Sequence, residues 1–511
     1  MRADPNSTIR PLDHLALAGT DDAPALVLRS GVLTYKDLRS RIASLAGWLQ
    51  GQISELGARV ATWAAKGELS CLMPLAAARA GLVHVPINPL LKRAQVAHIL
   101  HDSGARLLVG TPARLASLEA DDITDLYRVV EEGAALAEAA DAAPLCASAA
   151  SPDALAAILY TSGSTGRPKG VMLSHANMWL GAESVAEYLG LSAEDRTLAV
   201  LPLSFDYGQN QLFSAWFAGG VVVPLDYLTP RDVIKAISRH DITTLAAVPP
   251  LWIQLAEQEW PAEAATRLRR LTNSGGALTE PLVRRLRALF PAARLFAMYG
   301  LTEAFRSTYL DPALIDTHPT SMGKAIPHAE VLVIDDAGTV AADGAEGELV
   351  HCGPLVAQGY WQDPERTAER FRPAPAASRY GGLAVWSGDR VRRDADGLLY
   401  FAGRRDAMIK SAGNRISPQE IEDAAVATGL VVEAVALGIA DERLGHAVHL
   451  VVRAAADTFD VAEEFRSRLL KELPNFMAPK EIHWRTQMPR NPNGKIDRIA
   501  LTADVTSELA A

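Results

Sequence analysis

The sequence predicts an α/β fold, in which a large N-terminal region of stacked α/β subdomains and a small β subdomain precede a C-terminal α+β domain. Three observations lead to this expectation. Short apolar runs alternate with amphipathic stretches over about the first 330 residues, which is typical of largely parallel sheets with helices on their faces. Closely spaced strand-like segments follow, separated by turns rich in Asp and Gly. The chain of 511 residues then ends in about 100 residues with strands and helices of their own.

The first elements alternate in type along the chain. Apolar runs that predict strands are separated by amphipathic stretches that predict helices. In chain order the segments are Ala25–Leu28, Tyr35–Leu49, Arg59–Trp63, Ser70–Ala80, His84–Ile87, Gln95–Ser103 and Arg106–Gly110. The next stretch, Glu131–Asp153, is rich in Ala, Asp, Pro and Ser with little periodicity. It predicts either a loop between subdomains or an Ala-rich surface helix.

The alternation resumes at residue 154. Within it the charge-free stretch Gln209–Leu225 is interrupted by Gly and Pro and is shorter than the ~20 residues of a membrane-spanning helix, so we expect a buried helix and then a buried strand. The strands of the β subdomain are expected at Val331–Ile334, Glu348–His351 and Leu398–Phe401. From about residue 407 the elements expected are Pro418–Ala427, Val432–Leu437, Ala447–Val452 and Val461–Leu473.

Composition and charge exclude several classes of protein. Hydrophobic residues make up 49% and charged residues 22%, so most of the chain should fold. With 50 Lys and Arg against 60 Asp and Glu, the net charge is -10, and neither a nucleic acid nor a membrane surface is an expected partner. The three cysteines, Cys71, Cys146 and Cys352, are odd in number and lie far apart without metal-ligand spacing, so neither a disulfide framework nor a zinc site is expected. The first residues have no apolar core of a secretory signal, and a cytoplasmic location is expected.

The strongest local signal is the segment Tyr160–Gly170, YTSGSTGRPKG, which follows the apolar run Leu155–Leu159. Glycines let backbone amides approach anionic oxygens, hydroxyls donate hydrogen bonds, and Lys169 adds a positive charge, so the segment suits a polyphosphate. The spacing differs from that of a Walker P-loop. The residues predicted to contact the nucleotide here are Thr161, Ser162, Gly163, Ser164, Thr165 and Gly166.

With this segment and the other motifs given below, the chain resembles the AMP-forming adenylating superfamily of acyl-CoA synthetases, peptide-synthetase adenylation domains and luciferases. Ser274-Gly275-Gly276-Ala277 resembles the loop that holds the adenine. Met298-Tyr299-Gly300-Leu301-Thr302-Glu303 resembles the motif in which Tyr stacks on the adenine, Thr touches the phosphate and Glu holds Mg²⁺. Ser387-Gly388-Asp389 resembles the motif whose carboxylate receives the ribose hydroxyls, with Ser in place of Thr. The resemblance covers nearly the whole chain.

The remaining motifs concern the C-terminal domain. The resemblance implies an N-terminal domain over residues 1–402, a hinge over 403–406 with Asp406 as the hinge residue, and a mobile cap over 407–511. Arg404 and Arg415 are expected to contact phosphate. The segment Pro489–Arg498 matches the motif whose lysine completes the adenylation site, so Lys495 is predicted to be catalytic, together with Lys169, Thr302 and Glu303.

The acyl pocket departs from the acyl-CoA synthetase pattern. Phe205 stands where many of those enzymes have His, and Asp206 follows it, as in amino-acid-activating relatives, where the Asp binds the α-ammonium. Asp206 has an alternative role as the cap of a helix beginning near Gly208. Arg306 could meet a second polar group of the substrate or a carboxylate such as Asp206, or lie exposed on a loop. The pocket is also expected to draw on Tyr207, Asn210, Met298 and Ser307.

The resemblance implies an ATP- and Mg²⁺-dependent carboxylate ligase that makes an acyl-adenylate, releases pyrophosphate and passes the acyl group to a thiol. No fused carrier-protein motif is present, so the acceptor would be CoA or a separate phosphopantetheinyl carrier protein. Two alternatives stay open. One is an amide-forming ligase in which an amine attacks the adenylate. The other is a non-catalytic nucleotide-binding homologue, which the presence of Lys169, Glu303, Asp389 and Lys495 disfavours.

Overall fold

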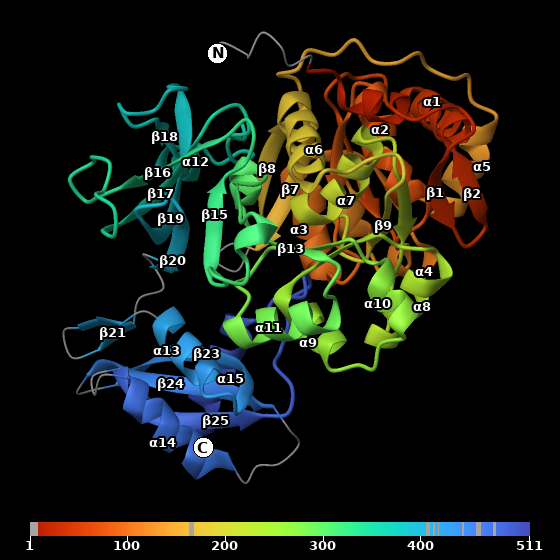
Figure 1. Ribbon diagram of the computed structural model, residues 1–511. Coiled ribbons are helices and arrows are strands. Elements are labelled where there is room, and N and C mark those ends of the chain that lie inside the picture. The colour runs from red at the N-terminus through yellow and green to blue at the C-terminus, as the bar shows by residue number, and fades with distance from the viewer. Residues whose placement is uncertain are drawn as a thin grey trace.

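A computed structural model describes residues 9–162, 168–404, 409–411, 414–416, 418–441, 444–455, 461–473 and 477–510. Figure 1 shows a large region of helices and sheets, with the blue C-terminal elements gathered on one side of it. In the described part of the chain the strands form three sheets. Two of them build the large region, and the third belongs to the C-terminal domain.

The six-stranded sheet has the order β6-β5-β3-β4-β7-β8 among the described residues. Its strands are β3 (Arg59–Trp63), β4 (Val83–Pro86), β5 (Ala105–Gly110), β6 (Arg128–Glu131), β7 (Leu155–Ser162) and β8 (Pro168–Ser174). The strands run parallel except β8, which pairs antiparallel with β7. The expected parallel sheet is therefore present, and the described ends of the predicted phosphate-binding segment lie on the paired strands β7 and β8 at its edge.

The larger sheet has fourteen strands within the described ranges, and its strand pairing changes from parallel to antiparallel along the sheet. One half is parallel: β1 (Pro24–Leu28), β9 (Arg196–Ala199), β10 (Val221–Pro224), β11 (Thr244–Ala247), β12 (Arg270–Asn273) and β13 (Arg294–Tyr299), with β2 (Gly31–Thr34) antiparallel at the edge. The other half is antiparallel: β14 (Thr308–Tyr309), β15 (Ser321–Ala325), β16 (Glu330–Ile334), β17 (Glu346–Cys352), β18 (Phe371–Pro373), β19 (Leu383–Arg393) and β20 (Leu399–Arg404). The expected β subdomain is thus an extension of the parallel half.

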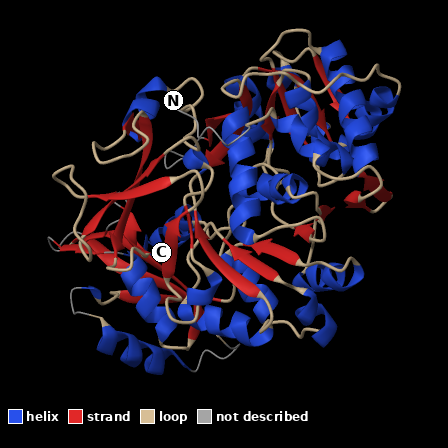
Figure 2. Ribbon diagram, turned by 45° about the horizontal axis from the view of Figure 1, so that its top comes forward, coloured by secondary structure: helices blue, strands red, loops and turns tan. Residues whose placement is uncertain are grey.

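Helices pack against the strands of the large region, as Figure 2 shows. They are α1 (Tyr35–Gln52), α2 (Glu68–Arg79), α3 (Arg93–Ser103), α4 (Pro112–Leu115), α5 (Glu132–Ala140), α6 (His175–Leu189), α7 (Asp206–Phe217), α8 (Pro230–Arg239), α9 (Pro249–Ala256), α10 (Ala262–Arg267), α11 (Glu280–Leu289) and α12 (Pro364–Arg370). Local sequence explains two starts, because Thr34 forms a capping box with Asp37 at α1 and Ser174 one with Asn177 at α6. Of the two alternatives for residues 131–153, the first part is the helix α5 and the rest has no regular element.

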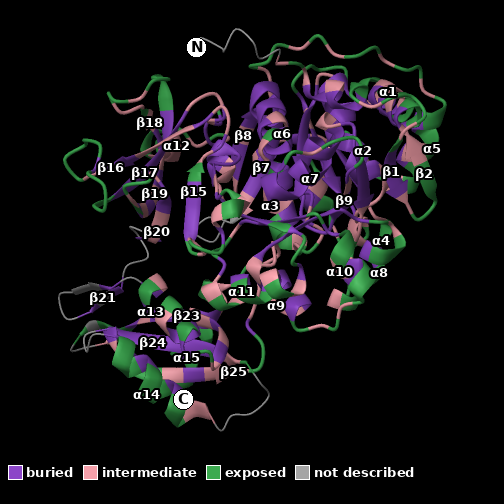
Figure 3. Ribbon diagram, in the orientation of Figure 1, coloured by how far each residue is buried: buried purple, intermediate pink, exposed green. Residues whose placement is uncertain are grey.

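The central strands and the helices between them form the core. Figure 3 shows burial concentrated on β7, β8, β9 and β13 and the helices beside them. Gln209–Leu225 is a buried helix followed by the buried strand β10, as expected. Among the described residues, no helix combines the length and the apolar character that crossing a membrane requires.

The C-terminal domain is an α+β unit. Its sheet contains β21 (Ile409–Ser411), β22 (Asn414–Ile416), β23 (Val431–Asp441), β24 (Gly445–Ala454) and β25 (Glu481–Arg485), and its helices are α13 (Pro418–Ala427), α14 (Ala462–Glu472) and α15 (Arg498–Ala510). The domain touches the large region through polar contacts. Asn88 donates to the Pro492 carbonyl at 3.0 Å and to Asn493 Oδ1 at 2.9 Å, and Arg453 pairs with Glu257 at 3.1 Å.

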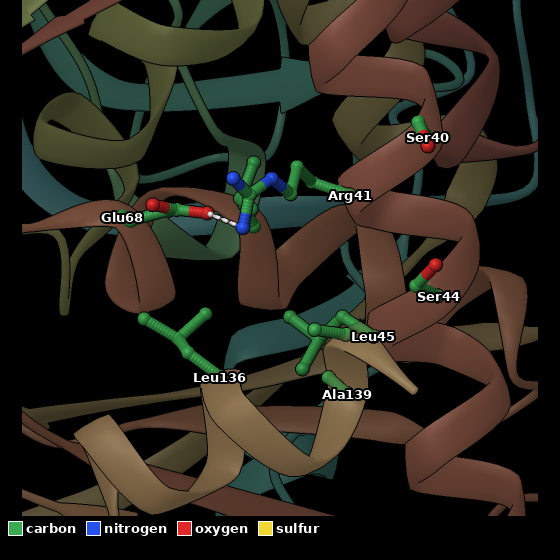
Figure 4. A pocket seen from close by; sticks show the side chains of 9 residues that line it. Ser40, Arg41, Ser44, Leu45, Glu68, Leu136 and Ala139 are labelled. Carbon is green, nitrogen blue, oxygen red and sulfur yellow. Dashed lines mark ion pairs between the residues drawn. The ribbon is translucent and has the colours of Figure 1, made fainter. Parts of the chain in front are cut away.

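A cavity of about 240 Å³ lies between α1, α2 and α5. Figure 4 shows Leu45 and Leu136 facing it, with an Arg41–Glu68 ion pair of 3.4 Å at its edge. Its lining includes no residue that the motifs predict to be functional.

Candidate active site

The predicted site residues gather where the large sheet changes from parallel to antiparallel. Ser274 follows β12, Thr302 and Glu303 follow β13, and Asp206 begins α7 just beyond β9. The carboxyl ends of parallel strands lie at one edge of a sheet, which brings these segments together. The chain thus assembles its chemical groups from separate loops at that edge.

Lys169, Glu303 and Tyr360 form a buried polar cluster. The Tyr360 hydroxyl donates to Glu303 Oε1 at 2.6 Å, and Lys169 Nζ lies 2.7 Å from that hydroxyl and 3.4 Å from Glu303 Oε1. Burial opposes the charge of Glu303, but Lys169 and the Tyr360 hydroxyl outweigh it and hold the pKa of Glu303 below its usual value. Glu303 is therefore ionised at neutral pH.

Glu303 also fits a magnesium ion by its chemistry. Mg²⁺ prefers carboxylate oxygens, and the contacts of Glu303 with Lys169 and with Tyr360 both use Oε1. The second oxygen, Oε2, is the atom offered to a cation.

Tyr299 and Asp389 join the two halves of the large sheet. The Tyr299 hydroxyl donates to Asp389 Oδ2 at 2.5 Å. Ser387, which replaces the expected Thr, donates to the Leu349 carbonyl at 2.6 Å and accepts from the Asp389 amide at 3.1 Å. Serine thus keeps the hydroxyl that bonds the backbone at this point of β19.

Lys495 enters the site from the C-terminal domain. Gly275 has a φ of +82°, and a β-carbon built on it would lie 2.9 Å from Lys495 Cε and 3.4 Å from Lys495 Nζ. β-Carbons built on Gly275 and on Gly494 would both contact Val248, so the two glycine turns face each other across this side chain. The turn that carries the lysine is closed by Asn491, whose side chain accepts from the Lys495 amide at 3.0 Å. Lys495 therefore reaches the loop that the motifs assign to adenine.

Asp206 and Arg306 form a buried pair of opposite charge. Arg306 Nη2 lies 3.9 Å from Asp206 Oδ2, and the Thr302 hydroxyl donates to Asp206 Oδ1 at 3.0 Å. The two residues are 6% and 1% exposed, which excludes the exposed-loop alternative for Arg306. Burial raises the pKa of Asp206 above its usual value, although Arg306, Thr302 and Lys495 act in the opposite direction. The helix α7 begins at Asp206 itself, so the cap of a helix starting near Gly208 is not its role.

The remaining pocket residues surround this pair. The Arg306 guanidinium lies 4.6 Å above the Tyr207 ring, and its Nη1 donates to Ser274 Oγ at 2.7 Å. Gly300 packs closely on Arg306, because a β-carbon there would lie 3.1 Å from the Arg306 Cα.

Four further pocket residues are buried but differ in their contacts. Met298 accepts from the Tyr188 hydroxyl at 2.9 Å, and Ser307 Oγ lies 3.0 Å from His351 Nδ1. Phe205 belongs to the apolar core of the parallel half of the sheet. Asn210 is 3% exposed on α7.

Part of the predicted site cannot be placed. Gly163, Ser164, Thr165, Gly166 and Asp406 lie outside the described residues, and only the backbone of Ser162, Arg404 and Arg415 is described. Thr161 on β7 pairs with Lys169 on β8, which places these two residues of the predicted phosphate-binding segment side by side. Gly276 and Ala277 are exposed, and the Gly276 carbonyl accepts from Asn273 Nδ2 at 2.9 Å.

Tyr360 is a site residue that the motifs do not reveal. The Trp361 amide donates to the Gly170 carbonyl at 2.8 Å and the Met172 amide to the Gly359 carbonyl at 2.9 Å, which fastens residues 359–361 along β8. Tyr360 reaches Glu303 only through this pairing of segments about 190 residues apart, and no local pattern signals it.

A second group of possible metal ligands lies in the C-terminal domain. His449, Glu481 and His483 share one face of the sheet, and His449 Nδ1 lies 3.0 Å from His483 Nε2. One ring N–H donating to the other nitrogen accounts for this contact without an ion.

Comparison with known proteins finds relatives along most of the chain. The AMP-binding enzyme family matches residues 14–361, and the AMP-binding enzyme C-terminal domain matches residues 420–495. Tyrocidine synthase 2 of Brevibacillus parabrevis is 30% identical over 499 residues, which are 97% of this chain but 14% of that protein. The chain thus corresponds to a small part of this relative.

Two other relatives match over almost their whole length. The L-proline--[L-prolyl-carrier protein] ligase of Pseudomonas fluorescens is 31% identical over 495 residues, 94% of this chain and 96% of that protein. The crystal structure of ATP-bound MatB from Rhodopseudomonas palustris superposes with a TM-score of 0.88 at 25% identity, covering 98% of this chain and 99% of that one. The expected α/β fold is confirmed, and the chain belongs to the AMP-binding enzyme family.

Proposed function

We propose that the protein is an ATP-dependent, Mg²⁺-dependent carboxylate ligase that forms an acyl-adenylate and transfers the acyl group to the thiol of CoA or of a carrier protein. The position of Lys495 carries this proposal. The lysine crosses from the C-terminal domain to the glycine turn at Gly275, close enough to Asp206 to influence its pKa. Relatives that act on carrier proteins or bind ATP support the choice of substrates.

The chemistry needs cations more than it needs a nucleophile. The substrate carboxylate attacks the α-phosphorus of ATP, a C–O–P anhydride forms and pyrophosphate leaves. Lys169 and Lys495 offset the repulsion between the anions and hold them in line. Mg²⁺, held at Glu303, would supply further neutralisation of phosphate charge. The thiol sulfur then attacks the acyl carbonyl and AMP leaves.

The domain arrangement belongs to the same proposal. We assign residues 1–402 to the N-terminal domain, 403–406 to the hinge and 407–511 to the cap. Asp406→Pro would fix φ at the hinge. We expect thiol transfer to fall in this variant while adenylation persists; full rates of both half-reactions would contradict the hinge assignment.

The deciding experiment is carboxylate-dependent exchange of labelled pyrophosphate into ATP, run with fatty, aryl and amino acids. We expect at least one acid to support exchange, and Lys495→Ala to lower it by roughly 100-fold or more. Turnover of supplied acyl-AMP with a thiol should stay nearly intact in this variant.

Lys480→Ala is the matched control. Lys480 is an exposed lysine of the same domain that pairs with Asp441, so its loss should change neither half-reaction. Absence of exchange with every acid would contradict the proposed function. Equal loss of both half-reactions in Lys495→Ala would contradict the role of the lysine.

A further inference from the structure

Arg306 is a buried cation with unused hydrogen-bonding capacity. It is 1% exposed, and its Nη1 bonds Ser274, whereas Nε and Nη2 have no hydrogen-bond partner among the described residues. A buried donor without a partner costs stability, and the cost is larger for a charged group. Such a group persists where a ligand supplies the missing acceptor.

Asp206 is the matching anion. Its carboxylate lies 3.9 Å from Arg306 Nη2, a separation that pairs the charges but is too long for a hydrogen bond. Thr302 occupies Oδ1. Asp206 and Arg306 therefore do not form a direct hydrogen bond. A ligand that carries one positive and one negative charge can pair with both residues, so neither buried charge is left without a partner.

The same face of α7 carries more unsatisfied polar atoms. Gln209 and Asn210 lie three and four residues after Asp206, which places all three side chains on one side of the helix. Within the described residues, both amide atoms of Gln209 and the Asn210 Oδ1 lack partners, and the two residues are 0% and 3% exposed. An apolar acyl chain would leave these groups unsatisfied, whereas a polar one would not.

We propose that the acyl substrate is an amino acid with a second carboxylate, whose ammonium binds Asp206 and whose distal carboxylate binds Arg306. This inference rests on the proposed function. In the proposed function Lys495 acts on the reacting carboxylate, so every charge that enters the pocket meets one of opposite sign. A plain fatty acid satisfies neither Arg306 nor Asn210, and a neutral amino acid would share Asp206 between its ammonium and Arg306, which would leave Arg306 without an anion of its own.

The test is pyrophosphate exchange with wild-type protein and acids matched in length. The series consists of pentanoate, glutarate, 2-aminopentanoate and glutamate, extended by aspartate and 2-aminoadipate to vary the reach of the side chain. We expect kcat/KM for the best amino dicarboxylate to exceed that for 2-aminopentanoate and glutarate by roughly 100-fold, because a site built for polar groups rejects analogues that lack them. A preference for pentanoate or 2-aminopentanoate would overturn the inference.

Two variants identify the residues responsible. Arg306→Met should remove the preference for the distal carboxylate, so that 2-aminopentanoate equals or exceeds glutamate. Asp206→Asn should remove the preference for the ammonium, so that glutarate approaches glutamate. Uniform loss with all acids in both variants would assign Arg306 and Asp206 a structural role and overturn the inference.

Arg270→Met is the matched control. Arg270 is another buried arginine, and it pairs with Asp195 at a distance of 2.5 Å. Neither residue belongs to the acyl pocket, so the loss of Arg270 should leave the ranking of the acids by kcat/KM unchanged. No exchange with any acid would contradict the proposed function. Exchange confined to acids that lack the second carboxylate would overturn only this inference.

Discussion

At Gly275 a missing side chain makes room for a lysine from the other domain. The residue has a positive φ, and any β-carbon would press on Lys495 Cε. A substitution at Gly275 therefore has two effects, which are backbone strain and displacement of Lys495. A substitution at a glycine that has the same φ but no close neighbours causes only the strain.

Gly338 provides that comparison, since it also has a φ of +82° and its added β-carbon would meet nothing within 4 Å. Both Gly275→Ala and Gly338→Ala should cost about 1–2 kcal/mol of stability. We expect only Gly275→Ala to lower pyrophosphate exchange, by about 10-fold or more, while thiol transfer from supplied acyl-AMP is retained. Equal exchange rates in the two variants would show that the lysine does not need the space.

Tyr360 holds two opposite charges in place with one hydroxyl. Tyr360→Phe removes the hydroxyl and with it the hydrogen bonds to Glu303 and Lys169. Each hydrogen bond to a charged group contributes about 1.5–3 kcal/mol to stability. We expect kcat/KM for MgATP in exchange to fall by about 10-fold or more. Tyr400→Phe is the control: Tyr400 lies on β20, the variant loses a bond to His318, and exchange should stay unchanged.

On the scale of single elements, the sequence predicts what local pattern determines. Arg59–Trp63 and Pro418–Ala427 have the bounds of β3 and α13, because apolar runs and proline at a helix start are local signals. The helix α7 starts at Asp206 rather than near Gly208, and Asp206 contacts Thr302 on a distant loop, a contact that no local pattern signals. Tyr360 was missed for the same reason: backbone pairing with β8 brings it to the site.

Strand β17 buries a histidine whose proton uptake should affect stability. Burial lowers the pKa of His351 to about 3 from 6.5. Below pH 6.5 the unfolded imidazole binds a proton that the folded one does not, so folding stability falls as the pH falls toward 3. One such group contributes about 1.4 kcal/mol per pH unit.

We therefore expect His351→Gln to lose less stability than the wild type between pH 7 and pH 5, by about 2 kcal/mol, in urea unfolding followed by fluorescence. His84→Gln should behave alike, because burial lowers the pKa of His84 to about 3 as well. Identical losses in wild type and both variants would contradict the neutral state of these rings.

On the scale of the whole molecule, polar contacts of Asn88 and Glu257 join the large region to the C-terminal domain. Asn88 bonds the segment just before Lys495, so Asn88→Ala should lower exchange several-fold while leaving thiol transfer from acyl-AMP unaffected. Glu257→Gln breaks the partly exposed pair with Arg453, which is worth about 0–1 kcal/mol, and should have a smaller effect. Equal effects of the two substitutions on exchange would show that Asn88 does not position the lysine.

The contacts of the Lys495 turn have a mechanical consequence. Asn88 follows a strand of the six-stranded sheet, whereas Gly275 and Val248 follow strands of the larger one. The turn thus contacts loops of two different sheets, and its position depends on how these two sheets lie relative to each other. A ligand that makes one sheet slide against the other would move the ammonium even if the C-terminal domain kept its own shape. The rate of adenylate formation would then depend on the relative position of the two sheets.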